Sequence, residues 1–216
     1  MTSTMTSGRS GSSIVTVAPV VLMASFVYHP YISDLTDKAA VAAALTQDTA
    51  RWGFAHLAVG VGAALVMLAF LAIHRYLCEA GEGRWSALGV PFIVLGSTLF
   101  AFLPAMEIAM LGAAAAGADV TAVLNAMNPW FLPILLAGAA LFALGVLGFA
   151  AEIVSSGVLE REQTWLVVAA LVVTAATRFV PLGPALYVGG AALIVALWPL
   201  AYEMSKRTPR LDAAAV

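Results

Sequence analysis

The chain has 216 residues, of which 62% are hydrophobic and only 10% are charged, and its formal net charge at pH 7 is −2. This balance lies far outside that of soluble globular domains and indicates a protein whose solvent is lipid. The absence of basic runs argues against a nucleic-acid partner, and a single cysteine, Cys78, excludes an internal disulfide.

Three regions are expected along the chain. Residues 1–12 are rich in Ser, Thr and Gly and predict a disordered cytoplasmic tail. Residues 13–204 predict the membrane domain, and residues 205–216 a short basic cytoplasmic tail. A signal peptide is an alternative interpretation of the first apolar run, but no convincing small-residue cleavage pattern follows it.

Six stretches are long and apolar enough to cross a bilayer core of about 30 Å, which needs roughly 20 mostly apolar residues. They lack period-2 alternation, and a helix satisfies every backbone polar group inside its own segment, as lipid requires. The sequence therefore predicts an all-α integral membrane protein, a six-helix transmembrane bundle with spans at 13–32, 53–77, 86–112, 129–154, 164–182 and 184–203.

The connections between the spans carry their own signals. Residues 36–47 and 119–127 predict short amphipathic helices on the membrane surface, which could act as lids or merely connect the spans. Asp48 is a candidate N-cap for the second span, and an Asn-Pro pair ending at Pro129 predicts the start of the fourth. The Pro-Leu-Gly-Pro segment at 181–184 predicts a sharp turn between the last two.

An internal repeat is visible when the spans are paired. Gly-Ala-Ala-Leu begins at Gly62, Gly138 and Gly190 in the second, fourth and sixth spans. Phe-containing segments recur near one end of the first, third and fifth. The simplest interpretation is three repeated helical hairpins.

The distribution of Lys and Arg predicts that both termini are cytoplasmic. With the N-terminus inside, seven basic residues lie on the cytoplasmic side and two lie outside, which follows the positive-inside rule. The inside group is Arg9, Arg75, Arg84, Arg161, Lys206, Arg207 and Arg210, and the outside group is Lys38 and Arg51.

Polar and ionisable residues gather near the outer ends of the predicted spans. At 1.5 Å per residue, Arg178 lies about 21 Å above Thr164, in the outer third of the core. His29, His56 and Glu107 are expected in the same outer-leaflet layer. Because intramembrane charges are costly and usually face a partner inside the bundle, this layer predicts a polar pocket for a small or lipid-like ligand.

Two roles are open for Arg178. It can anchor the acidic head group of a ligand, with Thr174, Thr177, His29 and Tyr28 as further ligand-binding residues. It can instead form a buried ion pair with Glu107 that joins the third span to the fifth. The histidines also have a structural interpretation, as hydrogen-bonded interfacial side chains.

Several other functions stay open at this stage. A membrane-embedded enzyme on a lipophilic, isoprenoid-like substrate would use Glu107 as general acid and His56 as a second acid or base. No metal or other cofactor is predicted, with b-type haem between His29 and His56, or a zinc or copper site there, as alternatives. A transporter, a homo-oligomer or an accessory subunit of a larger membrane complex are the remaining interpretations.

One resemblance adds a location. The run Arg51-Trp52-Gly53-Phe54-Ala55-His56-Leu57, the Gly/Ala/Leu-rich helix after it and the short loop at Arg84-Trp85 resemble small multi-pass membrane proteins of high-GC bacteria that are usually called uncharacterised. The resemblance covers most of the chain. It implies a bacterial plasma-membrane location and supplies no activity.

The predicted orientation can be tested by labelling single cysteines in a Cys78→Ala background. We expect an impermeant thiol reagent added outside intact cells to modify cysteines at positions 38 and 119 and to leave one at 161 unmodified. The opposite pattern would reverse the orientation and move the polar layer to the cytoplasmic leaflet.

Overall fold

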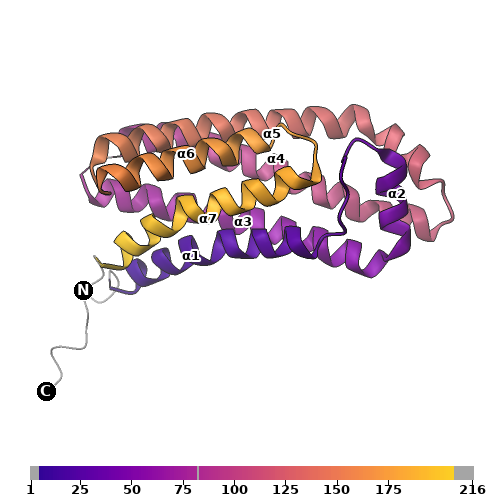
Figure 1. The fold of residues 1–216 in the computed structure, drawn as a ribbon, viewed down its shortest axis with the longest axis horizontal. Coiled ribbons are helices and arrows are strands. Elements are labelled where there is room, and N and C mark those ends of the chain that lie inside the picture. Colours follow the sequence, from indigo (N-terminus) through magenta and orange to yellow (C-terminus); the bar gives the residue numbers. More distant parts are fainter. Residues whose placement is uncertain (1–4, 82, 207–216) are drawn as a thin grey trace, which may run out of the picture.

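The protein is described by a computed structural model, which covers residues 5–81 and 83–206 and in which these residues form seven α-helices (Figure 1). The helices are α1 (Met5–Tyr28), α2 (Lys38–Gln47), α3 (Thr49–Glu79), α4 (Arg84–Ala115), α5 (Val120–Ser156), α6 (Arg161–Thr177) and α7 (Gly183–Lys206). The predicted all-α class is correct.

Five of the helices, α1, α3, α4, α5 and α7, are long and apolar enough to cross a membrane. The chain is therefore a multi-pass membrane protein by the length and composition of its helices. The fifth expected span, 164–182, is represented by α6, which has only 17 residues and ends at Thr177. The helix stops there because the residue before Pro181 is disfavoured in the α region, so the expected set of six spans is not confirmed.

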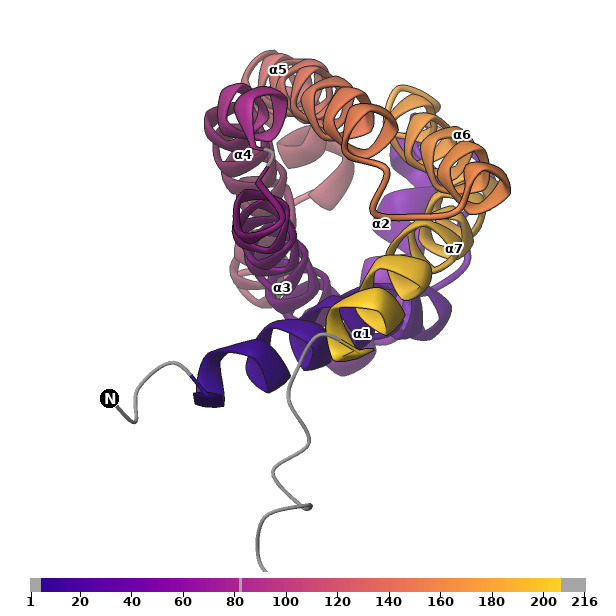
Figure 2. The ribbon, with the colours of Figure 1, turned by 90° about the vertical axis from the view of Figure 1, so that its left-hand side faces the viewer.

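The six longer helices form a closed ring. Seen along the bundle, α1 packs on α3, α3 on α4, α4 on α5, α5 on α6, α6 on α7 and α7 on α1 (Figure 2). Inside the ring, Phe70 of α3 meets Phe142 and Phe149 of α5 edge to face, at ring-centroid distances of 5.8 and 4.9 Å. Side chains on the outside are often large and apolar, including Leu57, Leu95 and Leu147. An apolar outer surface of this kind suits lipid contact.

A second, smaller core lies at the end of the bundle that contains His56, which we call the His56 end. Here α2 crosses the ends of the longer helices (Figure 1), and its Leu45 packs with Trp52 of α3 and Met110 of α4. Val120 and Leu124 of α5 complete this core. Trp52 is only 1% exposed. The Trp52 indole is thus covered by protein.

The predicted caps are partly correct. The helix expected at 36–47 is α2, and the Asp48 side chain accepts from Arg51 N at the start of α3. The helix expected at 119–127 is not separate, since it is continuous with the next span in α5, and Pro129 lies inside that helix. Asp119 provides the N-cap by accepting from Ala122 N, and a membrane helix tolerates an internal proline when its neighbours compensate.

Two loops are joined at the His56 end. Leu35 N donates to Pro181 O at 3.0 Å, and Gly183 N donates to Ser33 O at 3.0 Å. Hydrogen bonds from the side chain and backbone of Thr36 lower the pKa of the Asp34 carboxyl in the same loop. The segment after α1 is therefore fixed against the turn between α6 and α7.

The three-hairpin repeat is not confirmed. In a hairpin repeat, the marker glycine of each second helix should face the first helix of its own hairpin. Gly62 does so against Leu22 of α1, and Gly138 does so against Leu99 of α4. Gly190, however, faces Met23 of α1 rather than α6.

The expected boundaries of the tails differ at the start of the chain. Helix α1 already begins at Met5, inside the expected tail 1–12, and Ser12 Oγ donates to Ala201 O of α7 at 2.9 Å. Residues 1–4, 82 and 207–216 lie outside the described residues, and so does most of the expected basic tail.

Glycines set the close approach of α4 and α5, and this generates a prediction. A β-carbon at Gly96 would lie 2.5 Å from Phe142 N, whereas one at Gly112 on the same helix would meet nothing within 4 Å. We expect Gly96→Ala to lower the free energy of unfolding by about 1–3 kcal/mol through overpacking. Gly112→Ala should leave it unchanged or raise it slightly. Thermal unfolding in detergent measures both, and equal behaviour of the two variants would contradict the packing.

Candidate functional site

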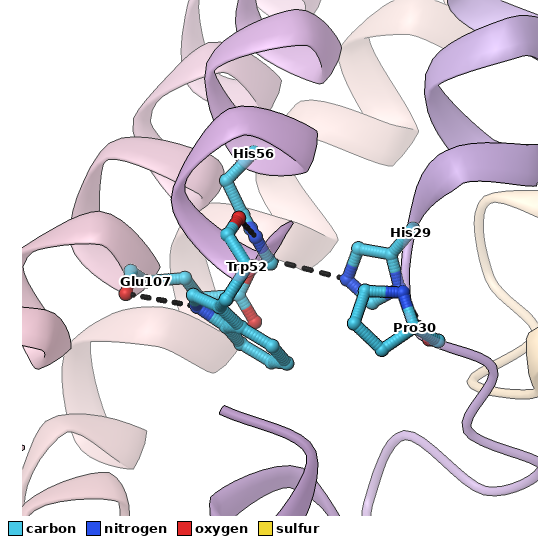
Figure 3. A network of polar contacts seen from close by, with 5 residues as sticks. All are labelled: His29, Pro30, Trp52, His56 and Glu107. Atoms are coloured by element: carbon cyan, nitrogen blue, oxygen red, sulfur yellow. Dashed lines mark hydrogen bonds and ion pairs between the residues drawn. The ribbon is translucent and has the colours of Figure 1, made fainter. Parts of the chain in front are cut away.

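Three ionisable side chains from three parts of the chain meet at the His56 end (Figure 3). His56 projects from α3, Glu107 from α4, and His29 follows the last residue of α1. His56 Nε2 lies 2.9 Å from Glu107 Oε2 and 3.3 Å from His29 Nε2. The three residues, here called the His56 triad, thus form a row with His56 in the middle. Their expected proximity is confirmed.

Backbone carbonyls orient both imidazoles. His56 Nδ1 donates to Trp52 O at 2.7 Å, one helical turn earlier, and His29 Nδ1 donates to Pro30 O at 2.7 Å. A carbonyl oxygen can only accept, so both Nδ1 atoms carry hydrogen. This leaves the two Nε2 atoms as the reactive positions, and they face each other.

Trp52 packs against the two imidazoles of the triad and donates a hydrogen bond to the backbone of Glu107. Its ring centroid lies 4.3 Å from that of His56 and 5.3 Å from that of His29, and its Nε1 donates to Glu107 O at 3.2 Å. Arg51 adds a second support, because its Nε donates to Tyr28 O at 2.8 Å and holds the end of α1. Tyr28, expected to bind ligand, contributes this carbonyl while its side chain is exposed.

The triad is buried on one side and accessible on the other. The His56 side chain is 4% exposed and that of Glu107 is 24% exposed. His29 is partly buried. An enclosed His56 between two more accessible groups can exchange protons with them. The arrangement also places His56 and Glu107, the expected catalytic residues, in direct contact.

Arg178 lies elsewhere, and its expected ion pair with Glu107 is wrong. The guanidinium carbon sits 3.6 Å from the ring centroid of Phe142 and 4.6 Å from that of Phe100. Phe100 precedes Glu107 by seven residues on α4, which is two turns or about 10.5 Å along the helix axis. Arg178 therefore lies deeper in the bundle than the triad, and Glu107 pairs with His56 instead.

One nitrogen of Arg178 is left without a protein partner. Its Nη1 is buried and makes no hydrogen bond to any described residue. The backbone N–H of Arg178 caps the end of α6, and the side chain reaches across to rings on α4 and α5. Sequence reasoning identified Arg178 but not these two phenylalanines, because an apolar span contains many similar rings.

The two threonines expected near the ligand are satisfied within the protein. Thr174 Oγ1 donates to Ala170 O at 2.9 Å, and Thr177 Oγ1 donates to Thr174 O at 3.0 Å. Such bonds to the preceding turn are usual for threonine in membrane helices. Their hydroxyl oxygens could still accept a hydrogen bond, but their donors are in use.

A further buried carboxylate, Glu152 of α5, was not expected to have a role. It is fully buried, and its Oε2 accepts from Trp85 N at 2.7 Å and from Ser86 N at 3.0 Å. It thereby caps α4, whose own N-cap residue, Gly83, has no side chain to do so. The available sequence signals were the missing cap at Gly83 and the position of Glu152 near the end of its expected span, at the same membrane face.

The geometry bears on metal and haem ligation. Within residues 5–81 and 83–206, no group of three or more His, Cys, Asp and Glu side chains is arranged to hold a metal ion. Bonds from imidazole to a metal are about 2 Å long, so a haem iron held from opposite faces by His29 and His56 requires their nitrogens about 4 Å apart. They lie 3.3 Å apart and would have to separate.

Comparison of the chain with models of protein families, with curated proteins and with solved structures finds no match.

The capping role of Glu152 can be tested by Glu152→Ala. Because two buried amides at the start of α4 would lose their acceptor, we expect the free energy of unfolding to fall by about 1–3 kcal/mol for each amide left unsatisfied. Glu160→Ala is the matched control, since that exposed glutamate makes no side-chain cap at the start of α6. Thermal shifts of equal size in the two variants would refute the cap.

Proposed function

We propose that this membrane protein binds a small or lipid-like ligand with an acidic head group, and that Arg178 is the anchor. The observation that carries the proposal is the buried Nη1 of Arg178, which lacks a hydrogen-bond acceptor among the described residues. A carboxylate or phosphate would supply both the acceptor and the missing negative charge.

Magnitudes favour a ligand over a purely structural role. Stacking on aromatic rings contributes about 0.5–2 kcal/mol, whereas taking a cation out of water costs several kcal/mol. The guanidinium carbon lies over the rings of Phe100 and Phe142, which offer no lone-pair acceptor to the guanidinium edge, where the N–H donors lie. The edge offers a planar fork that matches a carboxylate or phosphate in a bidentate arrangement.

The surroundings suit an amphiphile that arrives from the bilayer. Phe179 and Val180 follow Arg178 directly and are exposed, so an apolar tail could lie against them while the head group reaches the guanidinium. In addition, α6 has 17 residues against 37 in α5, so α5 extends beyond α6 towards the His56 end (Figure 1). We expect a lipid to approach Arg178 alongside this extension of α5.

We place the ligand in the outer leaflet of a bacterial plasma membrane, with both termini cytoplasmic. Support comes from the Lys and Arg count and from the resemblance of residues 51–57. In an accessory subunit, a partner protein would supply the carboxylate in place of a ligand. The experiment below has to separate these two sources.

The test compares Arg178→Lys with Arg161→Lys, the same substitution at an exposed position at the other end of α6. Lysine keeps the charge but loses the planar fork and the stacking, so Arg178→Lys should fold and lose most of a co-purifying acidic amphiphile. Arg161→Lys should retain it. Mass spectrometry of lipid extracts from the purified proteins gives the readout, with phosphatidylglycerol added to the detergent as a defined probe.

Two outcomes would contradict the proposal. The first is equal content of acidic amphiphile in Arg178→Lys and Arg161→Lys. The second is a wild-type protein that retains no acidic amphiphile but co-purifies with a partner protein that the Arg178→Lys variant loses. The latter result would establish the accessory-subunit interpretation.

A further inference from the structure

We propose that Glu107, His56 and His29 form a proton relay through the enclosed His56, between the partly exposed side of Glu107 and the surface at the end of α1. The proposal concerns the His56 triad and does not depend on a ligand at Arg178. It rests on the assignment of hydrogens that the contacts impose on three atoms in a row, Glu107 Oε2, His56 Nε2 and His29 Nε2.

The first step concerns His29. Its Nδ1 hydrogen is committed to Pro30 O, so in the neutral ring Nε2 has a lone pair and can only accept. The hydrogen between the two facing Nε2 atoms must then come from His56. His56 Nδ1 is also protonated, because it donates to Trp52 O. His56 therefore carries hydrogen on both nitrogens and is an imidazolium.

The second step concerns Glu107. Its Oε2 lies 2.9 Å from the same His56 Nε2. As a carboxylate, Glu107 accepts a hydrogen bond from the His56 Nε2–H, which His56 also donates to His29 Nε2. The alternative, a carboxylic acid that donates to neutral His56, would leave two nitrogen lone pairs facing each other at 3.3 Å. The imidazolium with carboxylate is free of that repulsion. Both arrangements leave the triad with no net charge, so the contact between the two Nε2 atoms decides between them.

The charges around the two rings support the same assignment. The ionisable groups that act on His29 are His56, Glu107 and Arg51, and the group that acts on His56 is Glu107. Arg51 Nη2 lies 3.5 Å from His29 O and repels a positive charge on that ring. The proton thus resides on His56 at rest and reaches His29 only in passing.

Transfer then takes two balanced steps. In the first, the His56 Nε2–H bond breaks and a His29 Nε2–H bond forms, which leaves His56 neutral and His29 an imidazolium that can release its proton to water. In the second, Glu107 takes a proton from water or from an acidic group at its exposed side and passes it to His56 Nε2. The net result is one proton moved along the row, with no change of oxidation state, and both steps are reversible.

Nitrogen NMR of protein with ¹⁵N-labelled histidine, in lipid nanodiscs at neutral pH, tests the resting state. The chain has three histidines, so a His74→Gln variant simplifies the assignment. We expect His56 to be protonated on both nitrogens and His29 on Nδ1 alone. Glu107→Gln should remove the imidazolium from His56, whereas Glu79→Gln, an exposed position at the other end of α3, should not.

Exchange of the His56 Nε2 hydrogen with water tests the transfer itself. If His29 is the main route to water, His29→Phe should slow this exchange by roughly 100-fold, the lower end of what a positioned base contributes, and the slower exchange that remains passes through Glu107. His74→Gln should leave it unchanged. A wild-type His56 with only one protonated nitrogen would overturn the proposal. So would an exchange rate that His29→Phe does not alter, in protein that is folded by its thermal transition.

Discussion

The His56 end depends on one imidazole that is enclosed by protein and hydrogen-bonded at both nitrogens. Its Nδ1 is held by the carbonyl of Trp52, and its Nε2 meets Glu107 of α4 and His29 after α1. Helices α1 and α4, the two neighbours of α3 in the ring of helices, are thus joined to α3 at the same depth. Trp52 reinforces the arrangement through Glu107 O and lies under α2. Hydrogen bonds restrict both distance and direction. In an apolar bundle, such contacts fix the relative positions of helices that apolar packing alone leaves free to slide.

Three ionisable side chains of the longer helices and their connections are balanced in three different ways. Glu152 receives two backbone amides of α4, and Glu107 receives an imidazole nitrogen. Arg178 receives only the faces of two aromatic rings. The first two arrangements hydrogen-bond one carboxylate oxygen, although Glu152 Oε1 is itself buried and unpaired, whereas Arg178 Nη1 is buried with no hydrogen-bond partner among the described residues. Since the cost of an unbalanced charge in a membrane is high, Arg178 is where we expect a molecule from outside the chain to bind.

Much of the fold was predictable, because lipid imposes length and composition on each span. The placement of His29, His56 and Glu107 at one level of the bundle followed from their depth along the helices, although Arg178 was expected at that level and lies deeper. The end of α6 was misjudged because the apolar run continues past Thr177, although the backbone breaks before Pro181. The partner of Glu107 could not be derived, since depth along a helix says nothing of rotation about it. Which aromatic rings meet Arg178 depends on the same rotations, and no spacing in the sequence reveals them.

The central claim is that the Arg178 guanidinium requires an acidic group from outside the chain. An experimental structure of the wild-type protein in nanodiscs that contain phosphatidylglycerol tests this most directly, by electron cryomicroscopy with a bound fiducial. The account predicts density for a phosphate or carboxylate within hydrogen-bond distance of Arg178 Nη1, with Phe100 and Phe142 against the guanidinium. A guanidinium with no such density, or one paired with Glu107, would contradict it.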